Sequence, residues 1–189
     1  MTVRVELPTA DDTRALGRAL ADVLEPGDLV VLGGPLGAGK TVLVQGIGAG
    51  LGVRARVTSP TFVLARVHAD GRIPLVHVDA YRLGSVEEID DLDLDADLAD
   101  AVTVVEWGHG LVERLSDAHL LIRLDRPDDG RPADGRPDDG RPDDGRPDDG
   151  RPDDGRREGD GRRTAELVPS GGSWADRLGR LEPVLLSRS

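Results

Sequence analysis

The chain has 189 residues, of which 36 are acidic and 24 are basic, giving a formal net charge of −12. This length predicts one domain with a sizeable core. The negative charge and an aromatic content of 2% argue against a protein that binds nucleic acid tightly by itself. The absence of cysteine excludes disulfides and thiolate metal sites. No signal-peptide pattern and no membrane-spanning apolar run are present, so we expect a cytoplasmic protein.

The first fifty residues alternate between strand and helix patterns. Thr2 to Leu7 alternates apolar and polar residues and predicts an edge strand. A helix cap at Thr9-Ala10-Asp11-Asp12 precedes an amphipathic helix that we expect to end near Pro26-Gly27. Asp28 to Leu32 is an apolar run typical of a buried strand. A second helix follows over Thr41 to Leu51.

Between that strand and that helix lies Gly34-Pro35-Leu36-Gly37-Ala38-Gly39-Lys40-Thr41, which fits the phosphate-binding pattern G-x-x-x-x-G-K-[ST]. Glycines let backbone amides wrap a phosphate at the positive end of a helix. Lys40, the only lysine of the chain, would reach the β- and γ-phosphates, and the Thr41 hydroxyl would ligate Mg²⁺. The alternative is a glycine-rich turn that only joins a strand to a helix.

The middle of the chain predicts a hairpin and a further strand. A strand late in Val57 to Val67 and a strand over Ile73 to Val78 flank the turn signal Asp70-Gly71. A short helix is expected from Ser85, and the acidic stretch Asp90 to Asp100 predicts a solvated surface.

The last part of the chain predicts three strands, at Ala101 to Val105, His119 to Leu124 and Thr164 to Val168, and a terminal helix over Ser173 to Leu186, interrupted by Pro183. Residues 126–161 repeat Arg-Pro-Asp-Asp-Gly and cannot form a core, so we predict a disordered insert that expands a hairpin loop. We therefore expect residues 1–189 to form one domain containing this insert.

Two predicted strands end in an acid, Asp79 and Glu106. The carboxyl ends of strands in open α/β sheets face the ligand crevice, where acids could hold a metal and place a water. Each could instead be a surface or capping carboxylate. Thr61 lies in a loop where P-loop proteins carry a segment that senses the γ-phosphate. The alternative is a loop threonine whose hydroxyl bonds only to its own backbone. His77, on the same strand face as Asp79, is interpreted as a packed core or hinge histidine rather than a catalytic one.

Other P-loop families fit less well. The motif Asn-Lys-x-Asp, with which GTPases select guanine, is excluded because the chain contains no asparagine. Four motifs, in order, resemble the TsaE (YjeE) family over nearly the whole chain outside the repeat. They are the P-loop Gly34 to Thr41, Ser59-Pro60-Thr61-Phe62, His77-x-Asp79-x-Tyr81-Arg82-Leu83 and Val105-Glu106-Trp107.

This resemblance implies an α/β fold, a P-loop NTPase-like three-layer sandwich with a mixed central sheet. It implies Mg-dependent ATP hydrolysis that supports threonylcarbamoyladenosine formation at position 37 of tRNAs, with TsaD and TsaB as partners and tRNA contacted only indirectly. The resemblance also implies roles for individual residues. Asp79 would be needed for hydrolysis, Glu106 would hold Mg²⁺ together with Thr41, and Thr61 would belong to a switch-like loop. The remaining implied nucleotide-binding residues are Arg162 and the P-loop positions Gly34, Leu36, Gly37, Ala38, Gly39, Lys40 and Thr41.

Two other functions stay open at this stage. A free-standing P-loop kinase could use Val76-His77-Val78-Asp79 as the base for an acceptor hydroxyl. Such kinases usually carry an Arg-bearing lid, and the Arg-rich repeat is a poor lid. A nucleotide-binding adaptor without turnover is the second alternative.

Overall fold

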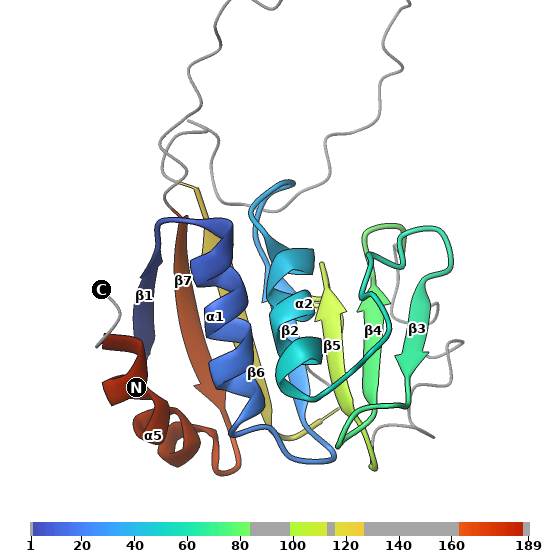
Figure 1. The fold of residues 1–189 in the computed structure, drawn as a ribbon. Helices are drawn as coiled ribbons and strands as arrows, with labels where there is room; N and C mark the ends of the chain where they lie inside the picture. The colour runs from blue at the N-terminus through green and yellow to red at the C-terminus, as the bar shows by residue number, and fades with distance from the viewer. Residues whose placement is uncertain (1, 84–98, 113–115, 127–162, 187–189) are drawn as a thin grey trace, which may run out of the picture.

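The computed structural model describes residues 2–83, 99–112, 116–126 and 163–186 (Figure 1). These residues form a seven-stranded sheet in the order β1-β7-β6-β2-β5-β4-β3. The strands are β1 (Val3–Leu7), β2 (Leu29–Gly33), β3 (Ala65–His68), β4 (Leu75–Asp79), β5 (Val102–Glu106), β6 (His119–Asp125) and β7 (Arg163–Ser170).

The sheet is mixed, as predicted. At its centre β6, β2, β5 and β4 run parallel, whereas β1, β7 and β3 pair antiparallel with their neighbours. β6 and β7 pair directly, with Asp125 opposite Thr164, which confirms that the repeat joins two adjacent antiparallel strands. Arg126, the first residue of the predicted insert, follows β6. The rest of that insert lies outside the described residues, so its disorder stays a prediction.

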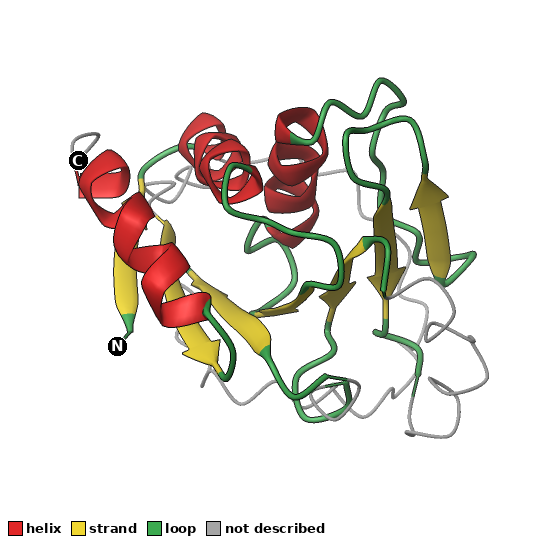
Figure 2. Cartoon of the chain, turned by 90° about the horizontal axis from the view of Figure 1, so that it is seen from below, coloured by secondary structure: helices red, strands yellow, loops and turns green. Residues whose placement is uncertain are grey.

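Three described helices cover one face of this sheet (Figures 1 and 2). They are α1 (Ala10–Ala21), α2 (Lys40–Gly50) and α5 (Trp174–Leu186). α1 ends at Ala21, before the expected Pro26-Gly27. The prediction that Pro183 interrupts the last helix is wrong, because α5 continues to Leu186. The short helix expected from Ser85 lies outside the described residues. None of the described helices is long and apolar enough to cross a bilayer.

Strand periodicity divides the core between the two faces of the sheet. In β2, Val30 and Leu32 pack beneath the helices, whereas Leu29 and Val31 belong to a second cluster on the opposite face. All four side chains are at most 1% exposed. Successive side chains of a strand point to opposite faces, so a continuous apolar run marks a strand buried on both sides.

Glycines allow α1 and α2 to pack in close contact. A methyl group at Gly17 of α1 would lie 2.4 Å from the Leu43 carbonyl oxygen, and one at Gly46 of α2 would lie 2.3 Å from that of Arg14. Both distances are shorter than any real contact, so only glycine fits. The N-terminus of α1 is fixed by a reciprocal capping box between Thr9 and Asp12. The close glycine contacts between α1 and α2 set the position of α2, whose first residue is Lys40.

A buried ion pair attaches α5 to the loop that enters β2. Arg177 donates from Nη1 and Nη2 to the two Asp28 carboxylate oxygens at 2.7 and 2.8 Å. Its guanidinium lies 3.9 Å from the centroid of the buried Trp174 ring. A bidentate arginine–carboxylate pair has a defined geometry, so it holds the C-terminal helix against the start of the central strand.

The close contact of the helices predicts the effect of one added methyl group. Gly46→Ala should destabilise the protein by about 1–3 kcal/mol through overpacking, although alanine is the better helix former. The matched control is Gly179→Ala in α5, where the added Cβ would meet nothing within 4 Å. That variant should be about 0.5–1 kcal/mol more stable than the wild type. Urea unfolding measures both, and equal effects of the two substitutions would contradict the packing argument.

Candidate nucleotide site

The P-loop lies where β2 ends and α2 begins. Gly34, Gly37 and Gly39 have φ values of 131°, 77° and 104°, a region that side chains with a Cβ rarely adopt. At Gly34 a Cβ would also lie 2.1 Å from the Leu124 carbonyl oxygen. The side chain of Ala38 is buried, whereas Leu36 is 84% exposed at the tip of the loop. The loop therefore offers its backbone, rather than its side chains, to a bound anion.

The Lys40 ammonium is folded back onto this loop. Its Nζ donates to the carbonyl oxygens of Gly34 and Pro35 at 2.7 and 2.9 Å. It also lies 3.6 Å from the centroid of the Trp107 ring. Burial lowers the pKa of Lys40 to about 8, although the nearby carboxylates of Glu106 and Asp79 act in the opposite direction. Lys40 is thus held by contacts that a phosphate group could replace.

Trp107 reaches this position through an unusual backbone conformation. It follows β5 directly and has a φ of 63°, which is uncommon for a residue with a Cβ. Its amide donates to the Leu32 carbonyl oxygen at 2.9 Å, which ties this turn to the end of β2. The Tyr81 ring lies 5.2 Å from the Trp107 ring, centroid to centroid, in a tilted arrangement. The turn after β5 therefore places an aromatic face above the lysine.

Glu106, the last residue of β5, meets the first turn of α2. The Thr41 hydroxyl donates to the Glu106 carboxylate, 2.9 Å from Oε1 and 3.2 Å from Oε2. Nε2 of His77 lies 2.8 Å from the same Oε1. Glu106 is 3% exposed and His77 is fully buried. A hydroxyl and a carboxylate are the hard oxygen donors that Mg²⁺ prefers, so the chemistry of this pair fits that ion.

Asp79 ends β4, directly opposite Glu106 in the parallel register. Its Oδ2 accepts from the hydroxyl of Thr61 at 2.5 Å and from that of Ser59 at 3.1 Å. Its Oδ1 accepts from the Tyr81 amide at 3.1 Å. Asp79 is 4% exposed, so these bonds satisfy a carboxylate that is largely removed from water. The loop that carries Ser59 and Thr61 is therefore fastened to the end of a central strand.

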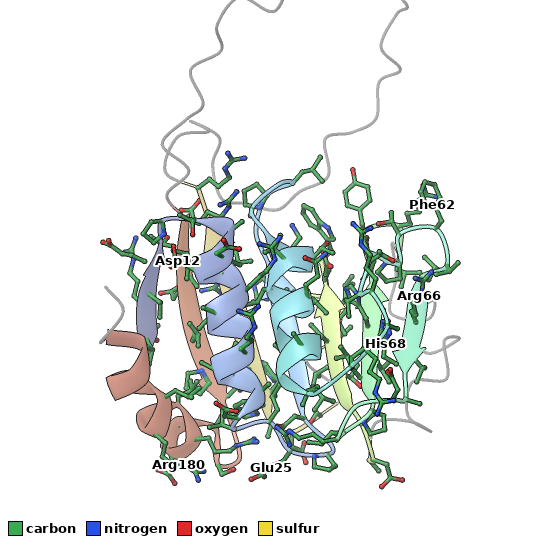
Figure 3. The ribbon with its side chains drawn as sticks, viewed as in Figure 1. Asp12, Glu25, Phe62, Arg66, His68 and Arg180 are labelled. Atoms are coloured by element: carbon green, nitrogen blue, oxygen red, sulfur yellow. The ribbon has the colours of Figure 1, made fainter. Side chains whose placement is uncertain are left out.

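Most of the predicted site residues lie at or just after the carboxyl ends of the parallel strands β2, β4 and β5, which are labelled in Figure 1. Lys40 contacts Trp107 directly after β5, Thr41 bonds to Glu106 at the end of β5, and Thr61 bonds to Asp79 at the end of β4. Phe62, which is 86% exposed, lies at this same edge of the sheet (Figure 3). Arg162 lies outside the described residues.

Two arginines near the P-loop were missed by the sequence interpretation. A methyl group at Gly37 would lie 3.4 Å from Nη1 of Arg126, and one at Gly39 would lie 3.6 Å from Cδ of Arg163. They stand at the end of β6 and the start of β7. The available signal was topological, since the β6–β7 hairpin, whose first strand pairs with β2, opens beside the P-loop. The low complexity of the repeat between them obscured it.

Comparison with protein families connects this geometry to a known group. A sequence model described as "Threonylcarbamoyl adenosine biosynthesis protein TsaE" matches residues 7–133. The chain belongs to the TsaE family. The predicted resemblance is thereby confirmed, and the match spans the P-loop, Asp79 and Glu106. The family is one of threonylcarbamoyl adenosine biosynthesis proteins, as its description states.

Individual relatives carry the same description. A tRNA threonylcarbamoyladenosine biosynthesis protein TsaE from Streptomyces coelicolor is 62% identical over 117 residues, covering 60% of this chain and 78% of the relative. The TsaE protein of Mycobacterium tuberculosis is 55% identical over 129 residues, or 64% of this chain and 77% of the relative. That of Bacillus subtilis is 39% identical over 120 residues, or 63% of this chain and 75% of the relative.

The fold has a counterpart among solved structures. A crystal structure of Bacillus subtilis YdiB aligns with a TM-score of 0.67, covering 97% of this chain and 95% of that chain at 24% identity. The likeness concerns the fold alone, and it confirms the predicted α/β class with a mixed central sheet.

The burial of Lys40 against Trp107 predicts a spectroscopic titration. In nucleotide-free protein in EDTA, tryptophan fluorescence should change with a midpoint near pH 8, because above this pH Lys40 loses its proton and the cation–π contact. Lys40→Met and Trp107→Phe should each abolish the transition. Trp174, the other tryptophan, remains in both variants and serves as an internal control. A wild-type midpoint above pH 10, where an unperturbed lysine titrates, would contradict the burial argument.

Proposed function

We propose that this TsaE-family chain is an ATPase that binds Mg²⁺ and ATP and supports threonylcarbamoyladenosine formation at position 37 of tRNAs. The observation that carries the proposal is the contact between Thr41 and Glu106, 2.9 Å long, at the mouth of a glycine-rich P-loop. It joins the hydroxyl expected to ligate magnesium to an acid on the neighbouring strand, which is the arrangement that phosphoryl transfer by P-loop proteins requires.

Each residue has a role in this proposal. The P-loop amides and the Lys40 ammonium bind the phosphates, with Lys40 leaving the Gly34 and Pro35 carbonyl oxygens to do so. Thr41 and Glu106 hold Mg²⁺, which supplies charge neutralisation for the phosphates when bound. Asp79 accepts a hydrogen bond from the nucleophilic water, and Thr61, now bonded to Asp79, reports on the γ-phosphate.

Arg126 and Arg163 extend the phosphate site in this proposal. Both are close enough to P-loop glycines to approach a phosphate bound there. Guanidinium groups suit this role because their planar fork matches phosphate oxygens.

The partners in this proposal are the subunits TsaD and TsaB, and tRNA is contacted only through them. The net charge of −12 supports this division, because an acidic subunit is repelled by a phosphate backbone. We place the protein in the cytoplasm, where tRNA is modified. The ATP turnover of the isolated chain is expected to be slow, with the partners completing the site.

Carboxamide substitutions test the proposed roles of the two acids. Asp79→Asn and Glu106→Gln should each lower partner-stimulated ATP turnover by about 10²–10³-fold, since the amide at position 79 no longer offers a carboxylate to the nucleophilic water and the amide at position 106 no longer offers one to Mg²⁺, while both preserve shape. The matched control is Asp11→Asn in the first turn of α1, whose carboxylate is 90% exposed and should be dispensable. Phosphate release is measured with TsaD and TsaB present, in parallel with threonylcarbamoyladenosine formation on tRNA.

Unchanged turnover in both acid variants would refute the proposal that ATP is hydrolysed at the site formed by Asp79 and Glu106. ATP-dependent phosphorylation of a small metabolite without the partners would instead favour a free-standing kinase. Normal tRNA modification with a non-hydrolysable ATP analogue would favour an adaptor that binds nucleotide without turnover.

A further inference from the structure

The interior of the sheet contains a histidine that the roles above leave unused. His77 is the middle residue of β4, is fully buried, and shares a strand face with Leu75, which belongs to the core cluster that includes Leu43 of α2. Its Nε2 lies 2.8 Å from Glu106 Oε1, whereas its Nδ1 is buried and has no hydrogen-bond partner among the described residues. Burying a polar ring costs free energy when one of its nitrogens, here Nδ1, lacks a hydrogen bond. A residue kept in the core at this cost indicates a specific use for the bonded nitrogen, Nε2.

The chemistry of the contact determines the tautomer. An ionised carboxylate can only accept hydrogen bonds, so Nε2 of His77 must carry a proton, and its N–H donates the hydrogen bond to Glu106. A neutral ring then leaves Nδ1 as an unprotonated acceptor. The β4–β5 register explains the contact, because His77 pairs with Val104, two residues before Glu106 on the same face of the sheet.

The two oxygens of Glu106 are not equivalent. Oε1 accepts from both His77 and Thr41, at 2.8 and 2.9 Å, which fills its two lone-pair directions. Among the described residues, Oε2 has only the longer contact of 3.2 Å with Thr41. The hydrogen bond from His77 therefore fixes the rotation of the carboxylate and leaves Oε2 with capacity for a further partner.

We propose that His77 is a positioning residue that orients the Glu106 carboxylate, so that Oε2 is presented to the magnesium ion that accompanies the nucleotide. This inference rests on the proposed function, because it assumes that Thr41 and Glu106 hold that ion. Groups that hydrogen-bond a metal-binding carboxylate restrict its orientation before the metal arrives, and this raises metal affinity without direct contact. His77 thus acts on magnesium through Glu106 and does not touch substrate.

Two amide substitutions separate positioning from core packing. In His77→Gln the side-chain nitrogen can occupy the place of Nε2, whereas in His77→Asn the shorter side chain reaches only the place of Nδ1. Both variants put a neutral amide in the same buried position, and only glutamine can restore the bond to Glu106. Thr103→Val is a further control, because it changes a buried polar side chain on the neighbouring strand, β5, away from Glu106.

The readout is the affinity for ADP by calorimetry, measured in Mg²⁺ and again in EDTA, together with the melting temperature. In His77→Asn the gain in ADP affinity produced by Mg²⁺ should fall by about tenfold or more, while the affinity in EDTA stays within about twofold. His77→Gln and Thr103→Val should keep the gain within about threefold of the wild type.

Equal losses in the asparagine and glutamine variants, or no loss in either, would overturn the positioning role. If His77→Asn fails to fold, His77→Gln decides alone, because a folded glutamine variant without the magnesium gain contradicts the proposal. Failure of the underlying function looks different. In that case the wild type itself would show no magnesium-dependent gain, or Lys40→Met would leave ADP affinity unchanged.

Discussion

The bond between the Thr41 hydroxyl and the Glu106 carboxylate joins the two parts of the site on which the proposed chemistry depends. Thr41 belongs to the helix that follows the P-loop, and Glu106 ends a strand 65 residues later. They meet because β5 lies beside β2 in parallel, with Glu106 opposite Leu32. Parallel neighbours end at the same edge of a sheet, so the strand order itself brings the acid to the phosphate-binding loop.

Close helix packing gives this contact its stability. Gly17 and Gly46 let α1 and α2 approach until backbone atoms touch, which leaves α2 little freedom to shift along the sheet. On the other side, Glu106 is held by His77 from β4. The site therefore combines a glycine-rich loop with a closely packed helix and two fully buried strands. Preorganisation of this kind lets a bound ion or phosphate replace existing contacts without rebuilding the surroundings.

Lys40 and Thr61 both occupy positions that nucleotide binding could change. Lys40 is bonded to two carbonyl oxygens of its own loop, and Thr61 is bonded to Asp79. Each of these bonds satisfies a group that is largely removed from water, so neither can be broken at low cost unless another partner replaces it. A triphosphate offers such a partner to the lysine. In the proposed function, these internal contacts stand in for those of the bound nucleotide, and exchange between the two sets of contacts would provide a physical basis for a switch.

Local patterns in the sequence determined most elements and pointed to the candidate site residues. The P-loop follows from glycines and one lysine, the strands from apolar runs, and Asp79 and Glu106 from their places after such runs, because these signals depend only on neighbouring residues. Tertiary structure alone decided that His77 bonds to Glu106, that Trp107 covers Lys40, and that Arg126 and Arg163 flank the P-loop. These contacts depend on strand order and register, which join residues distant in the chain and leave no local pattern.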